Sequence, residues 1–266
     1  MVAEAAGVGL DGRERPTEDR VMLLPHAVLL ADGVTALRDD QRSGGWYAGQ
    51  LCTTLARHLT ADPTADLRAV LSTAITDLAR EYALVPGDAP SSTIAMLRWT
   101  GDRVDALVLA DSPVIAFTHT GVDPLVDDRI AGLLPGGYRQ RLRSGGGYGP
   151  DHVAAVRTSG VTTDRLRNVP GGFWVAEADP AAAAEARVRT WPRGEVTAVL
   201  LTSDGVSCGV DDYHLFDWPD VLALAVDRGP AAVLTEVRDA EHADPDGLRW
   251  PRPKRHDDQA LVLVRF

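Results

Sequence analysis

Residues 26–35 read HAVLLADGVT, a short run of Val, Leu and Ala that ends at Asp32-Gly33. Short apolar runs bounded by turn residues predict buried strands, so Asp32 should lie where a strand meets its loop. Three further runs meet an aspartate in the same way: VDALVLADSP at Asp111, VTAVLLTSDGVS at Asp204, and HDDQALVLVRF at Asp257 and Asp258. Carboxylates gathered at one sheet edge repel one another by roughly 4 kcal/mol per close pair at an effective dielectric of about 20. The pattern therefore predicts a bound cation.

The first half of the chain predicts strands and helices in separate groups. Residues 20–31 are expected to form two short strands broken at Pro25, hence a hairpin. Helices are expected after Ser43 and from about 64 to 82, where apolar residues recur at helical spacing. Residues 92–120 predict a meander of three strands. This order favours an α+β fold of antiparallel sheets covered by helices over alternating βαβ units.

The second half is less regular between about 123 and 193. Short helices are expected near 129–142 and 181–189. The run SGGGYGP at 144–150 is interpreted as a flexible turn, because it neither follows a clear strand nor contains the Lys-Ser/Thr of a P-loop. Beyond Asp217, cap residues predict two successive helices, and ALVLVRF at the C-terminus predicts a buried strand.

Composition limits the classes of function. A chain of 266 residues with 45% hydrophobic content is expected to be one domain, spanning 1–266. The net charge of −11 opposes binding to nucleic acid or to an anionic membrane, so neither is expected as a partner. Two cysteines without a CxxC motif indicate a reducing compartment, and no run approaches the roughly 20 apolar residues that span a bilayer. A cytoplasmic protein is expected.

The residue types around the aspartates select the chemistry. In Asp32-Gly33 and Asp204-Gly205 the glycine leaves room for a backbone carbonyl to approach a hard cation together with the carboxylate. Oxygen ligands favour Mg²⁺, Mn²⁺ or Ca²⁺, whereas the histidines show no paired spacing typical of zinc. A serine hydrolase is disfavoured by the absence of a GxSxG motif, and a glycosidase by an element order that suggests no barrel. Taken singly, each Asp-Gly pair could also be an ordinary turn.

Five motifs occur in a fixed order along nearly the whole chain: TED at 17–19, ADGVT at 31–35, ADS at 110–112, TSDGV at 202–206 and HDDQALVLV at 256–264. Together they resemble the metal-dependent protein phosphatase family (PPM, type 2C). The resemblance implies two packed antiparallel β-sheets flanked by α-helices, in α-β-β-α layers. It also implies a metal centre in the cleft at one end of the sandwich.

The resemblance further implies a role for each acid. The implied metal set comprises Asp32 with the Gly33 carbonyl, Asp204, Asp257, the water-holding Glu18 and Asp19, and Asp111 for a third, weaker metal. Asp32 is expected to bridge two Mg²⁺ or Mn²⁺ ions. The implied reaction is hydrolysis of a phosphomonoester by a water that both metals activate, without a covalent enzyme intermediate.

Three departures from the family pattern bear on the phosphate end of the site. Arg15 is expected to contact phosphate, although Glu14 occupies the register that the family gives to an arginine. The first Asp-Gly is followed by Val-Thr-Ala at 34–36 instead of His-Gly-Gly, so the usual histidine candidate for the general acid is missing. A metal-bound water or another group would then protonate the leaving group, and His256 is one candidate. Asp258 stands where the family usually has Asn, and we expect it either to raise the demand for metal or to face solvent.

The leading prediction is a Mg²⁺- or Mn²⁺-dependent hydrolase that dephosphorylates phosphoserine or phosphothreonine in proteins. A phosphatase of small molecules with the same centre is one alternative. A phosphatase-like binding or regulatory module without turnover is the other; its mark would be loss of metal carboxylates, yet Asp32, Asp204 and Asp257 remain. The sequence leaves the oligomeric state and the physiological substrate open.

Overall fold

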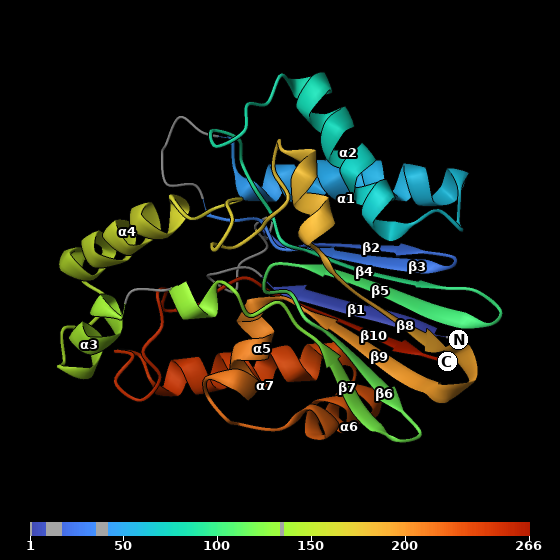
Figure 1. Cartoon of the computed structure of the whole chain (residues 1–266). Helices are drawn as coiled ribbons and strands as arrows, with labels where there is room; N and C mark the ends of the chain where they lie inside the picture. The colour runs from blue at the N-terminus through green and yellow to red at the C-terminus, as the bar shows by residue number, and fades with distance from the viewer. Residues whose placement is uncertain (1, 9–17, 36–41, 134–135) are drawn as a thin grey trace.

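A computed structural model describes residues 2–8, 18–35, 42–133 and 136–266, and in these residues two antiparallel five-stranded sheets pack face to face (Figure 1). The first sheet has the order β1 (Val2–Val8), β10 (Gln259–Arg265), β9 (Val196–Thr202), β6 (Val114–Thr118) and β7 (Gly121–Leu125). The second has the order β2 (Arg20–Leu24), β3 (Ala27–Ala31), β4 (Ile94–Trp99), β5 (Arg103–Leu109) and β8 (Arg187–Pro192). The predicted sandwich is confirmed.

Helices cover the outer faces of both sheets (Figure 1). The second sheet is covered by α1 (Gly44–Ala61) and α2 (Leu67–Tyr82), and the first by α5 (Asp204–Asp211), α6 (Trp218–Arg228) and α7 (Pro230–Ala243). Two further helices, α3 (Gly137–Arg143) and α4 (Pro150–Asp164), project beside one end of the sandwich. Short 3₁₀ helices span Ala131–Leu133, Pro180–Glu185 and Arg193–Glu195. No helix in the described ranges is long and apolar enough to cross a membrane.

The continuous apolar run of β3 is explained by burial on both of its faces. Val28 and Leu30 pack between the two sheets, whereas Leu29 and Ala31 pack against the layer of α1 and α2. Successive side chains of a strand point to opposite faces, so a strand covered on both sides needs no polar alternation. Each fully buried Val or Leu contributes about 1.5–3 kcal/mol relative to exposure.

Polar caps set the helix boundaries. Ser43 Oγ accepts a hydrogen bond from the Trp46 amide at 3.1 Å, which begins α1 as expected. Asp66 accepts from the Ala69 amide at 2.9 Å, so α2 begins at Leu67, three residues later than the apolar pattern alone suggests. The two helices expected beyond Asp217 are also present, and Asp217 forms a capping box.

The predicted three-strand meander is wrong in its third strand. β5 pairs with β4 and β8, whereas β6 pairs with β7 and β9 in the opposite sheet. Between them Ala110 has a left-handed φ of 68°, a conformation that costs a non-glycine residue about 1–2 kcal/mol. Pro113 then cannot donate a ladder hydrogen bond. The chain therefore leaves one sheet for the other at Asp111.

Other differences concern elements without a strong periodic signal. β1 and α4 were not expected, and α3 occupies only the last part of the helix expected at 129–142. The helix expected at 181–189 is a 3₁₀ helix that ends at Glu185, because residues 187–192 pair with β5 instead. Residues 144–150 do form a turn between helices, with positive φ at Gly145 and Gly147.

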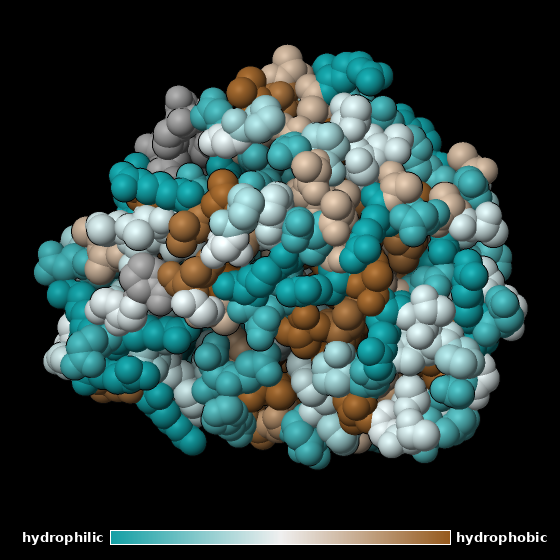
Figure 2. Space-filling view, viewed as in Figure 1, coloured by the Kyte–Doolittle hydropathy of each residue, from teal (hydrophilic) through white to brown (hydrophobic). Residues whose placement is uncertain are grey.

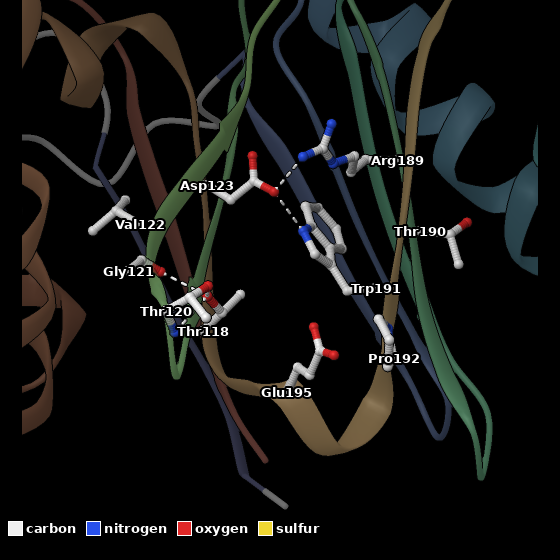
Figure 3. A pocket seen from close by; sticks show the side chains of 10 residues that line it. All are labelled: Thr118, Thr120, Gly121, Val122, Asp123, Arg189, Thr190, Trp191, Pro192 and Glu195. Atoms are coloured by element: carbon white, nitrogen blue, oxygen red, sulfur yellow. Dashed lines mark hydrogen bonds and ion pairs between the residues drawn. The ribbon is translucent and has the colours of Figure 1, made fainter.

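The edge strands β7 and β8 leave one side of the sandwich open. Hydrophobic side chains show at the surface in the middle of this face (Figure 2). A cavity of about 460 Å³ lies between the two strands. Asp123 of β7 crosses the gap: one carboxylate oxygen accepts from Arg189 Nη2 at 2.6 Å and from Trp191 Nε1 at 2.9 Å (Figure 3). This carboxylate ties the two sheets together at their edges.

Replacing Asp123 with Ala should lower the free energy of unfolding by about 1–2 kcal/mol, because both bonds are lost while the pair is partly exposed. Urea denaturation measures the change. Glu195→Ala is the matched control, since it removes a carboxyl that lines the same cavity and leaves both bonds in place. Equal stabilities of the two variants would contradict the tie.

Candidate metal centre

Four strand-end aspartates line one cleft of about 540 Å³. Asp32 follows β3, Asp111 follows β5, Asp204 opens α5 directly after β9, and Asp257 precedes β10. The cleft lies at the end of the sandwich beside α4 (Figure 1), and its other walls include residues of α4 and of the loop before β4. The structure thus brings together the four positions that the sequence pattern singled out.

The backbone at Asp32 is held by two hydroxyl residues that precede β4. The Asp32 amide donates to Thr93 Oγ1 at 3.0 Å, and Ser92 Oγ donates to the Asp32 carbonyl at 2.8 Å. Thr93 Oγ1 also bonds Ser112 Oγ at 2.6 Å, next to Asp111. These hydroxyls position two acids relative to each other, and neither periodicity nor a motif in the sequence indicates them.

Gly33 lies in backbone contact with the start of α1. A Cβ atom at Gly33 would lie 2.3 Å from the carbonyl carbon of Gly44 and from the amide of Gly45. A Cβ at Gly44 would in turn lie 2.3 Å from the Val34 carbonyl oxygen. Glycine is therefore required here for close approach of two backbone segments. This contact fixes the loop that carries Asp32.

Glu18 and Asp19 are anchored by residues from the C-terminal half of the chain. Asp19 is buried, and its Oδ2 accepts from Ser203 Oγ at 2.7 Å. Asp258 is buried as well, and its Oδ2 accepts from the Glu18 amide at 2.9 Å. The expectation that Asp258 faces solvent is wrong, because this carboxyl holds the segment that carries Glu18 and Asp19.

Burial and mutual repulsion raise the pKa values of several carboxyls in the cleft. Desolvation raises the pKa of Asp32 and of Asp204 well above the usual range, and repulsion from neighbouring carboxylates adds to it. Burial raises the pKa of Asp19 to about 7. Desolvation also raises the pKa of Asp111 and of Glu18. A centre of this kind retains protons near neutral pH unless a cation enters.

The carboxyl of Asp32 lies within electrostatic reach of those of Asp19 and Asp204, and repulsion from both adds to the effect of burial on the pKa of Asp32. Protonation relieves such repulsion, which agrees with the raised pKa values. Across the described parts of the chain, no group of three or more His, Cys, Asp or Glu side chains has the converging geometry of a metal site.

One cation lies among these acids. Lys254 Nζ donates to Asp257 Oδ1 at 2.8 Å, and Lys254 lines the cleft. Burial alone would lower the pKa of Lys254, but the carboxylates of Asp257, Asp204 and Asp32 outweigh it and raise the pKa. Lys254 belongs to no motif, so nothing in the sequence indicates its position at the site.

The donor set fits a divalent cation. It consists of carboxylate oxygens with a nearby backbone carbonyl at Gly33, which suits Mg²⁺ or Mn²⁺. The ammonium of Lys254 balances the charge of Asp257. Asp32 and Asp204 retain protons in the absence of a further cation, and a divalent ion would take the place of these protons.

The remaining candidates differ in their placement. His256 Nδ1 bonds Glu241 Oε2 at 2.9 Å on α7, and burial lowers the pKa of His256 to about 4. Its contacts and its protonation therefore give no support to a role as general acid. Arg15 and Glu14 lie outside the described residues. Arg42, which was not singled out, lines the cleft and stacks over the Trp46 ring at 4.5 Å.

No family model and no curated protein matches the sequence. Solved structures do match. The catalytic domain of the serine/threonine phosphatase PstP, solved with two manganese ions, shares 18% identity at a TM-score of 0.59, over 99% of this chain and 97% of that one. MsPP from Mycobacterium smegmatis, a PPM Ser-Thr phosphatase solved with cacodylate, shares 16% identity at a TM-score of 0.59, over 100% and 98%. The chain has the PPM phosphatase fold.

Another structure with this likeness is PppA, a regulatory component of T6SS in Pseudomonas aeruginosa, with 20% identity, a TM-score of 0.57 and coverage of 100% and 97%. The likeness extends over whole chains at low identity, so it concerns the arrangement of the sheets and helices. Within the PPM fold of this chain, Asp32, Asp111, Asp204 and Asp257 lie at one end of the sandwich, where the resemblance placed the metal centre.

Replacing Gly33 with Ala should disturb the cleft strongly, because the added methyl would overlap the backbone of α1. We expect a loss of stability of about 1–3 kcal/mol, typical of overpacking, measured as a lower midpoint of urea unfolding. Gly101→Ala is the matched control, since a Cβ there meets nothing within 4 Å. A Gly33 variant as stable as the Gly101 variant would contradict the close contact.

With divalent metal chelated by EDTA, stability should fall as pH rises from about 4 to 7. The pKa of Asp19 is about 7 in the fold and about 3.9 when unfolded, so the folded state binds more protons in this window and stability decreases with pH. Melting temperatures at pH 5 and 7 measure the slope. Asp19→Asn should flatten it; an unchanged slope in that variant would contradict the assignment.

Proposed function

We propose that the chain is a Mg²⁺- or Mn²⁺-dependent phosphatase that hydrolyses phosphoserine and phosphothreonine in proteins. The observation that carries the proposal is the gathering of Asp32, Asp204 and Asp257 from both sheets at one cleft of a PPM fold. The alternative of an inactive module would fit a chain that had lost these carboxylates. The serine/threonine phosphatases with this fold support the choice of substrate.

Each part of the cleft has a role in this proposal. Asp32, Asp204 and Asp257 would hold two divalent ions with the Gly33 carbonyl, Glu18 and Asp19 would support them, and Asp111 would serve a third. When bound, such ions neutralise charge on the phosphoryl group and make a water acidic enough to attack phosphorus. Hydrogen bonds between Thr93 and the Asp32 backbone and between Ser203 and Asp19 hold these acids in place before metal binds.

The entrance of the cleft supplies contacts for the rest of the substrate. The guanidinium of Arg42 lies on an aromatic ring and can bind a phosphate oxygen or an acidic neighbour. Apolar side chains such as Val156, Phe173 and Val175 line the cleft beside it. A phosphorylated side chain with apolar neighbours in a peptide matches this combination.

The test is hydrolysis of an aryl phosphate with and without Mn²⁺. Asp204→Asn keeps the size of the side chain but removes its charge, so kcat/KM should fall by about 100-fold or more. Asp239→Asn, on the exposed side of α7, is the control for loss of one carboxylate. Phosphate release that depends on neither Mn²⁺ nor Asp204 would overturn the proposal.

The substrate class is tested by a panel of phosphoserine and phosphothreonine peptides, nucleotides and sugar phosphates. A cleft of about 540 Å³ also has the size of a small-molecule site. Phosphopeptides should give the higher kcat/KM if the apolar wall contacts residues beside the phosphorylated one. A preference for nucleotides or sugar phosphates would assign the same centre to small molecules.

A further inference from the structure

Lys254 is the only lysine in a chain with 27 basic residues. All the other residues counted here are arginines. This single lysine lies in the coil that leads to β10, three residues before Asp257, and its side chain lines the acidic cleft. The cleft therefore contains an ammonium next to an acid of the proposed metal centre.

The contacts of Lys254 are with the residues that the proposed function assigns to metal. Nζ donates to Asp257 Oδ1 at 2.8 Å, and the same oxygen accepts from the Asp258 amide at 2.9 Å. The ammonium also interacts electrostatically with Asp204, Asp32 and Glu18. An oxygen that binds an ammonium and an amide has little capacity left for a metal ion.

The side chain is suited to leave this position. Its exposed fraction is 36%, so it borders the open part of the cleft and has room to move. Lysine carries a compact charge on a flexible stem of four carbons and makes a single-point contact, whereas arginine binds carboxylates through a rigid fork. An ammonium can therefore yield a carboxylate to a divalent ion more readily than a guanidinium can.

We propose that Lys254 is a built-in competitor of divalent metal: its ammonium neutralises Asp257 until a metal ion binds, and metal binding displaces it from that carboxylate. The inference rests on the proposed metal centre and adds to it an internal cation. It also agrees with the finding that, among the described residues, the acids do not converge as metal ligands. One of these carboxyls, that of Asp257, binds Lys254.

Competition has two linked consequences. A contact present only without metal stabilises that state, and by linkage it weakens metal binding by the same factor. Hydrogen bonds to charged groups are worth a factor of about 10 to 100 when buried. Because Lys254 is about a third exposed, solvent screening places the expected factor near 10.

The first experiment is Mn²⁺ titration of the wild type and of Lys254→Met by calorimetry, with melting temperatures in EDTA. Met keeps a similar length and apolar stem without charge. We expect about tenfold tighter Mn²⁺ binding in the variant and a lower melting temperature in EDTA. Arg228→Met on α6 is the control, because it removes one positive charge from a residue that does not line the cleft.

The second experiment needs no substitution. Because the chain has one lysine, protein labelled with ¹³C- and ¹⁵N-lysine gives one side-chain amine resonance. Adding Mg²⁺ should move this resonance toward that of a solvent-exposed lysine as the ammonium leaves Asp257. A resonance that stays unchanged at saturating Mg²⁺ would overturn displacement.

The outcomes separate this inference from the proposed function. Metal affinity that is equal or weaker in Lys254→Met overturns the competition and leaves the metal centre intact; weaker binding would place Lys254 beside the metals as a partner. If neither protein binds Mn²⁺ or Mg²⁺, the proposed metal centre fails, and the competition fails with it.

Discussion

The repulsion among carboxyls in one desolvated cleft is the constraint on which the rest of this structure depends. Burial desolvates Asp32 and Asp204, and Asp257 lies beside them, so the charges of this group must be balanced by protons, by an ammonium or by metal ions. Hydrogen bonds hold the acidic site in place: Thr93 Oγ1 accepts from the Asp32 amide, Ser203 Oγ donates to Asp19, and Asp258 accepts from the Glu18 amide. The close backbone contact at Gly33 leaves no room for a side chain at that position.

Strand direction explains why these acids meet. In an antiparallel sheet alternate strands run the same way, so β3 and β5, the two neighbours of β4, both end at the same side. β2 begins at that side and β9 ends beside the start of β10, which brings Asp19, Asp204 and Asp257 to the same end. The strand topology therefore brings these strand ends together, and an acidic residue is needed only at the end of each strand.

Much of this could be predicted from the sequence, since the strands and helices concerned have strong local signals. The hairpin at Pro25, the caps at Ser43 and Asp217 and the aspartates at strand ends follow from periodicity and turn chemistry. The passage of β6 into the other sheet could not be predicted, because an apolar run does not state which neighbour it pairs with. Lys254 was missed for a related reason: a lone charge in a coil has no pattern, and only the packing of β10 beside β9 places it among the acids.

The tie at Asp123 lies on the open edge of the sandwich and the acidic cleft at one of its ends, and both join one sheet to the other. Cations bound by Asp32 from one sheet and by Asp204 and Asp257 from the other would join the sheets reversibly at the cleft, whereas the Asp123 tie requires no metal. Withdrawal of metal would then remove the link between the sheets at the cleft and leave the link at Asp123. In such a molecule the affinity for metal and the spacing between the two sheets are aspects of a single equilibrium, so substitutions deep in the intersheet core can tune metal binding without touching a ligand.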